Sequence, residues 1–263
     1  MNRGFALVLL ALACALVPGA AWPELAPRAR LGDALALPLL GGIKLALQLL
    51  AAGFASACAR TFSRDDRPRR SFRALALAMS GFAAGQAVLL WWHGRGLDAP
   101  FPSPADACFI PATIVLALAL ADFAVAHARG GLSLVTPAQL RRTAGLATVV
   151  GAAALGLPLA AALRGLEGPL TQTIAAAYPV LDLAVVVPAA VVLRQLWLLR
   201  GSPLWRAWSR VLAGVVCLSL SDVGFAYVAA FELARLDPLL DFGFAAGYLL
   251  VAWGAWQHRR ALA

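Results

Sequence analysis

The chain has 263 residues, of which 62% are hydrophobic and 13% are charged, and its formal net charge is +9. So few charged residues cannot cover the surface of a soluble globular protein, which excludes that class. Apolar stretches of about 17–25 residues recur between short polar gaps, and a helix needs this length to cross a bilayer. The sequence therefore predicts an all-α, polytopic membrane helix bundle that forms a single transmembrane domain over residues 1–263.

The basic residues do not indicate a nucleic-acid partner. Most of the arginines occupy short gaps between apolar stretches, where they act as topology signals and contact anionic membrane lipids. The four cysteines lack metal-ligand spacing and are expected to be small buried residues. We expect the histidines to be interfacial residues rather than ligands of a metal or haem, because they are far apart in sequence at segment ends: His93, His127 and His258.

Residues 1–35 contain the first apolar segment and an outer loop. The segment is either a first spanning helix or a signal peptide, since it is short and is followed by Gly19, Ala20 and Ala21. If residues 1–21 are cleaved, the bundle has seven transmembrane helices, and otherwise it has eight. Seven further helices are predicted within the bundle of residues 36–258, at about 37–59, 72–92, 103–127, 141–163, 170–199, 208–231 and 238–257.

The distribution of arginines predicts the topology. If both termini are cytoplasmic, sixteen arginines lie on the cytoplasmic side and five lie outside, which follows the positive-inside rule. This predicts a multi-pass protein of the bacterial inner membrane. The sequence also suggests two parallel halves of four helices each. Gly85-Gln86 and Ala105-Asp106 in helices three and four resemble Ser221-Asp222 and Leu240-Asp241 in helices seven and eight.

Four acids lie at or inside hydrophobic segments. Carboxylates in a bilayer are costly unless they face a partner or a cavity, so each acid is a candidate site residue. Counting about 1.5 Å per residue from the outer helix ends puts these acids, the only lysine, one glutamine and all three tyrosines in the outer half. We therefore predict an outward-facing polar pocket that binds a ligand through Lys44, Gln86, Asp106, Tyr178, Asp182, Asp222, Tyr227, Asp241 and Tyr248.

Lys44 is expected to form an ion pair with Asp182 or Asp222, although its side chain could also reach the membrane surface. The sequence contains no zinc-protease pattern, nucleophile elbow or phosphate-binding loop. It therefore predicts no enzymatic activity, and it indicates no particular cofactor.

Four phrases in the order FPSPAD (101–106), AYPVLD (177–182), LSDVGFAY (220–227) and DFGFAAGYLL (241–250) resemble one known region. This is the multi-helix membrane sensor region at the amino terminus of many bacterial diguanylate cyclases, cyclic-di-GMP phosphodiesterases and sensor kinases. The resemblance covers about residues 36–258, and it departs at Gln86 and Phe109, where the pattern has aspartate and tyrosine. The positions that match the family's recurring residues are Asp106, Tyr178, Pro179, Asp182, Asp222 and Asp241.

The resemblance implies a sensor-like receptor that binds a small or lipid-derived ligand. Because the chain ends at Ala263 without a cyclase, phosphodiesterase or kinase domain, we expect a stand-alone module that signals through a partner protein at its cytoplasmic face. The intramembrane acids also suit an alternative function as a small-molecule or ion-coupled transporter. A scaffold subunit of a membrane complex is the second alternative.

Overall fold

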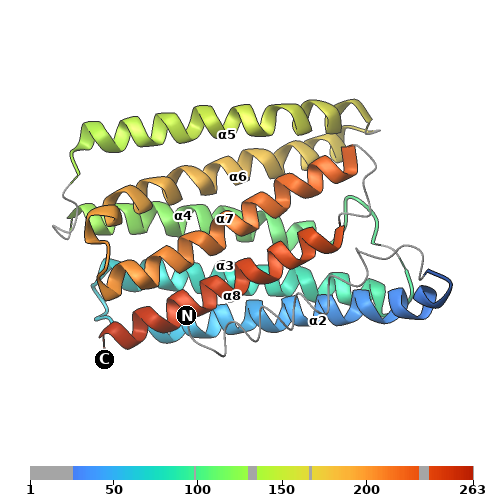
Figure 1. Ribbon diagram of the computed structural model, residues 1–263, viewed down its shortest axis with the longest axis horizontal. Coiled ribbons are helices and arrows are strands. Elements are labelled where there is room, and N and C mark those ends of the chain that lie inside the picture. Colours follow the sequence, from blue (N-terminus) through green and yellow to red (C-terminus); the bar gives the residue numbers. More distant parts are fainter. Residues whose placement is uncertain (1–25, 98, 130–134, 166–167, 231–236, 263) are drawn as a thin grey trace.

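The computed structural model describes residues 26–97, 99–129, 135–165, 168–230 and 237–262, and this part of the chain is helical without any strand (Figure 1). A short 3₁₀ turn, η2 (Trp197–Leu199), follows the fifth of seven long helices. The long helices are α2 (Ala26–Ala59), α3 (Arg67–His93), α4 (Asp106–Arg129), α5 (Pro137–Gly165), α6 (Pro169–Leu196), α7 (Pro203–Ala230) and α8 (Asp237–Leu262).

These helices confirm the seven predicted between residues 36 and 258, whereas the predicted first helix lies outside the described residues. The outer loop predicted before residue 36 is wrong from Ala26 onward, because α2 begins there. Charged residues do not stop a helix, and Pro27 falls in the first turn, where its missing N–H is not needed. The predicted repeat of four plus four helices is not supported, since no first helix is described.

Six helices in the described part of the chain are long and apolar enough to cross a membrane, which supports the prediction of a membrane bundle. They are α2, α3, α4, α6, α7 and α8. α5 is not among them, and several of its side chains near residues 157–165 lie outside the described set. A crossing by α5 therefore stays a prediction.

The six helices that are long and apolar enough to cross a membrane form a closed ring. α2 packs on α3, α3 on α4, α4 on α6, α6 on α7, α7 on α8, and α8 returns to α2. α5 lies outside the ring against α6 and α7, at the top edge of the bundle in Figure 1. Consecutive helices alternate in direction, so α3 and α7 begin at one end of the ring, and α4, α6 and α8 begin at the other. We call the first the basic end and the second the acidic end.

Proline and glycine set several helix boundaries. α3 follows Asp66 and has Pro68 in its first turn, and α6 starts at Pro169 directly after Gly168. Gly168 has a φ of 91°, a backbone conformation that other residues adopt only with strain. These boundaries fix where each helix starts, and so they fix how far along the bundle its polar side chains lie.

Small residues bring α7 and α8 close together. A Cβ atom at Gly214 would lie 2.6 Å from the carbonyl oxygen of Gly247, and one at Gly254 would lie 2.7 Å from that of Ala207. Side chains at these positions would push the two backbones apart, so the glycines permit the close approach that membrane helices use for packing. α7 and α8 thereby hold their polar residues in a fixed relative position.

Candidate functional site

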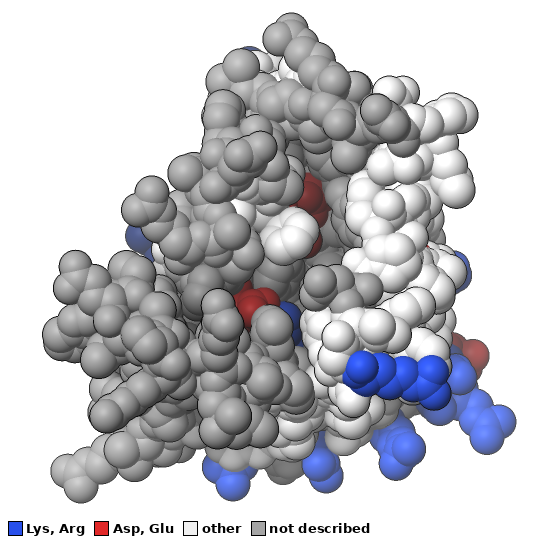
Figure 2. Space-filling view, turned by 90° about the vertical axis from the view of Figure 1, so that its right-hand side faces the viewer, with Lys and Arg blue, Asp and Glu red and all other residues white. Residues whose placement is uncertain are grey.

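All nine predicted site residues lie toward the acidic end of the ring, on the six helices that form it. Figure 2 looks onto this end and shows acidic and basic side chains inside a hollow between the helices. The nine residues are Lys44 on α2, Gln86 on α3, Asp106 on α4, Tyr178 and Asp182 on α6, Asp222 and Tyr227 on α7, and Asp241 and Tyr248 on α8.

Lys44 forms an ion pair with Asp241. The distance from Lys44 Nζ to Asp241 Oδ1 is 2.6 Å, and the side chains are 16% and 23% exposed, respectively. Lys44 Nζ also lies 6.0 Å from the centre of the Phe244 ring. The prediction that Lys44 pairs with Asp182 or Asp222 is therefore wrong, because α2 has α3 and α8 as its neighbours in the ring, whereas these acids are on α6 and α7.

Asp106 joins α4 to α6. Its Oδ2 accepts a hydrogen bond from the backbone N–H of Ser103 at 2.6 Å, which secures the turn that leads into α4. Its Oδ1 accepts a hydrogen bond from the hydroxyl of Tyr178 on α6. A carboxylate in the first turn of a helix also interacts favourably with the helix dipole. Asp106 therefore fixes both the start of α4 and the position of α6 beside it.

Asp182 and Asp222 face each other between α6 and α7. Their carboxyl groups lie within hydrogen-bonding reach of one another, and both are close to Tyr178. Asp182 is buried, and two ionised carboxylates in such close contact would repel each other strongly. This pair is therefore suited to share one proton or to hold a cation.

Gln48 is a member of the cluster that the sequence analysis missed. Its amide lies within hydrogen-bonding reach of the Tyr248 hydroxyl, and both side chains are buried. Within the described part of the chain, Gln48 Oε1 has no hydrogen-bond partner. A signal was present in the sequence, because Gln48 follows Lys44 by four residues and so lies on the same face of α2.

The remaining two predicted residues are Gln86 and Tyr227. Gln86 is buried, and its Nε2 lies 3.2 Å from the position that a Cβ of Gly41 would take, so it packs between α3 and α2. Tyr227 is partly buried on α7, five residues after Asp222. Five residues correspond to a rotation of about 140° around a helix, so Tyr227 points to another side than Asp222.

The side chains of this cluster are of the types that bind protons or charged groups. Four acids and one lysine meet at one end of the bundle, and tyrosine and glutamine side chains supply neutral hydrogen-bond donors. Within the described residues, no group of three or more His, Cys, Asp or Glu is arranged to hold a metal ion. The arrangement can bind or exchange a proton, or it can receive a small cationic group.

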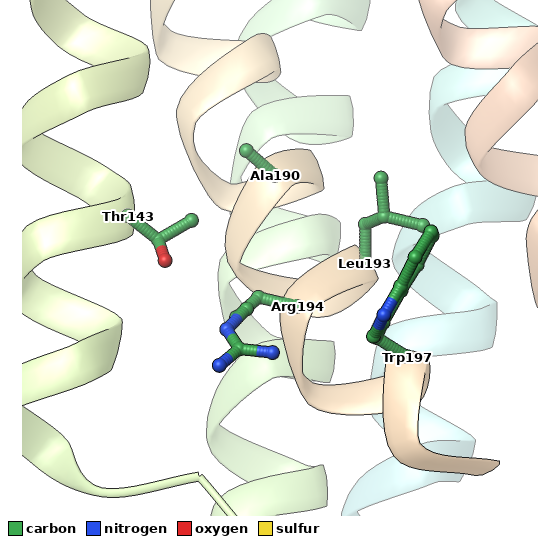
Figure 3. A pocket seen from close by; sticks show the side chains of 5 residues that line it. All are labelled: Thr143, Ala190, Leu193, Arg194 and Trp197. Carbon is green, nitrogen blue, oxygen red and sulfur yellow. The ribbon is translucent and has the colours of Figure 1, made fainter.

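A hollow between α5 and α6 at the basic end is not a comparable site. Figure 3 shows Thr143 on α5 facing Arg194 and Ala190 on α6, with Leu193 and Trp197 beside them. Its volume is about 280 Å³, and its lining is mainly apolar. Because polar side chains do not converge here, we do not regard this hollow as the functional site.

Comparison with known proteins gives no match for this chain among protein-family models, curated proteins or solved structures. The resemblance to bacterial membrane sensor regions therefore stays a prediction from the four sequence phrases.

Proposed function

We propose that the chain is a sensor-like receptor module of the membrane that binds a small or lipid-derived ligand in an outward-facing polar pocket at the acidic end. One observation carries this proposal, namely that each polar contact of the cluster joins two neighbouring helices of the ring. The contacts are Lys44 with Asp241, Asp106 with Tyr178, Asp182 with Asp222, and Gln48 with Tyr248.

The charges of the cluster favour a ligand with a cationic group, such as an amine. The described cluster contains four acids, and Lys44 pairs with one of them. An amine that enters between Asp182 and Asp222 would replace the repulsion between the two carboxylates by two charge-assisted hydrogen bonds. Such a ligand would bind one packing of α6 and α7 more tightly than another, which is the requirement for a conformational signal.

The arginine-rich connections at the opposite end supply the output surface of this proposal. They span residues 60–73, 129–142 and 194–210. Because helices are stiff, a change in packing at the acidic end also moves the helix ends at the basic end. We place the basic end and both termini in the cytoplasm of a bacterial inner membrane, in contact with anionic lipids, where a protein partner reads this movement.

Native mass spectrometry of the gently extracted protein tests the proposal, with identification of every molecule that dissociates from it. We expect one discrete molecule bound per chain, and we expect Asp182→Asn to abolish its retention. Asp122→Asn is the matched control, because Asp122 lies at the basic end and accepts a hydrogen bond from Ser71. Recovery of bulk lipid alone from the wild type, or equal retention by Asp182→Asn, would contradict the proposal.

The facing carboxyl groups of Asp182 and Asp222 also favour a second candidate function, a proton- or ion-coupled transporter. Acid pairs inside membrane proteins often mark ion pathways. In this function the pair would take up and release a proton or cation during each transport cycle. Uptake into proteoliposomes that is driven by a pH gradient and lost in Asp222→Asn would favour the transporter over the receptor.

A further inference from the structure

A second cavity, distinct from the polar cluster, lies at the basic end of the ring. It has a volume of about 420 Å³ and lies between α3, α4, α7 and α8. Aromatic rings form most of its wall: Phe72 packs edge-on against Phe123 at 4.9 Å and stacks on His258 at 4.9 Å. Trp208 lies 4.3 Å from Phe123 and 5.3 Å from His127, measured between ring centres.

Two buried polar atoms that line this cavity have no hydrogen-bond partner among the described residues. They are Trp208 Nε1 and His258 Nδ1, and their residues are 2% and 7% exposed. A buried polar atom without a partner is costly, so two on one cavity require an explanation. Trp208 is the most informative, because an indole N–H can only donate and therefore needs an acceptor that the described residues do not supply.

The charge at this cavity is positive. Arg67 from the start of α3 and Arg129 from the end of α4 belong to its lining, and no described lining residue is acidic. Two acids close by in sequence are already engaged. Asp66 accepts the backbone N–H of Ser63 at 2.8 Å, and Asp122 accepts the hydroxyl of Ser71 at 2.6 Å.

We propose that this cavity binds an amphiphilic organic anion. Its carboxylate or phosphate lies at the rim between Arg67 and Arg129, where guanidinium groups can form charge-assisted hydrogen bonds. Its apolar body enters between the aromatic rings and brings an acceptor oxygen to Trp208 Nε1. The volume of the cavity is in the range of small-molecule sites.

The arginines distinguish this site from an aromatic cage for quaternary ammonium groups, which would be repelled by two cations at the rim. The ligand could come from the bilayer, as a fatty acid or another anionic lipid, or from the aqueous phase, as an aromatic acid. Both sources share an anionic head and an apolar body. This site is at the end opposite to the acids of the proposed receptor pocket, so its test is independent of that proposal.

Native mass spectrometry of the full chain in a neutral detergent tests this inference with two probes. Oleate represents the membrane source, and 2-naphthoate represents the water-soluble source. We expect one molecule of at least one probe to bind per chain, roughly tenfold more weakly in the double variant Arg67→Gln, Arg129→Gln. Trp208→Phe keeps an aromatic ring but removes the N–H, and it should weaken binding about three- to tenfold.

The matched control is the double variant Arg141→Gln, Arg142→Gln, which removes two exposed arginines of α5 that do not belong to the cavity lining. Binding should be unchanged in this control. Retention of oleate would indicate a lipid source, and retention of 2-naphthoate would indicate a soluble one. The inference is overturned if neither probe binds, if the control weakens binding as much as Arg67→Gln, Arg129→Gln does, or if all variants bind like the wild type.

Discussion

Lys44 Nζ and Asp241 Oδ1 lie 2.6 Å apart and join α2 to α8 across 197 positions of the chain. This is the junction at which the ring of six helices closes, because α8 returns here to the first described helix. The two side chains are partly exposed, so the pair is not sealed inside the bundle. The same ion pair therefore connects the two helices that close the ring and forms part of the proposed pocket.

Replacing Lys44 by methionine should destabilise the bundle. The variant leaves the Asp241 carboxylate without its counter-ion, and the expected loss is about 1–3 kcal/mol, less than for a fully buried pair. Thermal unfolding in a mild detergent, followed by circular dichroism, measures the change. The double variant Lys44→Met, Asp241→Leu should recover most of the loss, because no charge is then left unpaired. Additive losses in the double variant would show that the two side chains do not interact.

The recurrence of apolar stretches is sufficient to predict seven helices from residue 36 onward. The sequence does not predict the start of α2. Polar residues before Pro38 are typical of a loop, yet the helix begins at Ala26 and continues through them. The closed ring could not be predicted from sequence, since which faces of apolar helices meet depends on small residues such as Gly214 and Gly247.

The sequence predicts that the polar side chains lie toward one end of the bundle, but it cannot assign their contacts. Depth along a helix follows from residue counting, whereas the partner of Lys44 depends on which helix is next to α2. The same limitation affects the histidines: His127 and His258 are far apart in sequence and were predicted to be interfacial, yet both are buried on one cavity. The contacts that connect distant segments thus required the structure.

Replacing Tyr178 by phenylalanine should loosen the contact between α4 and α6. The variant removes the hydroxyl that donates to Asp106 and leaves the rest of the ring in place, so we expect a loss of about 1–2 kcal/mol. Ser80→Ala is the control, because the Ser80 hydroxyl bonds only to the carbonyl of Ala76 on its own helix. Equal melting temperatures for Tyr178→Phe and the control would contradict a stabilising role of this hydrogen bond.

The same chemical change should have opposite effects at the two ends of the bundle. Asp182→Asn replaces a carboxyl group that faces Asp222 by an amide that can donate to it, so we expect a gain of about 0.5–1.5 kcal/mol. Asp122→Asn weakens the hydrogen bond accepted from Ser71, so we expect a loss of about 0.5–1 kcal/mol. Chemical or thermal unfolding of both variants checks the signs, and shifts in the same direction would refute this account of the acid pair.

Two glycine-to-alanine substitutions should separate close helix packing from helix propensity. In Gly214→Ala the new Cβ would lie 2.6 Å from the Gly247 carbonyl oxygen, so α7 and α8 must move apart, at a cost of about 1–3 kcal/mol. Gly53→Ala adds a methyl group where nothing lies within 4 Å, and it should gain about 0.5–1 kcal/mol from improved helix propensity. Because α7 carries Asp222 and α8 carries Asp241, Gly214→Ala should also weaken ligand retention in the native mass spectrum, whereas Gly53→Ala should not. If both variants are stabilised, α7 and α8 do not pack as closely as the structure shows.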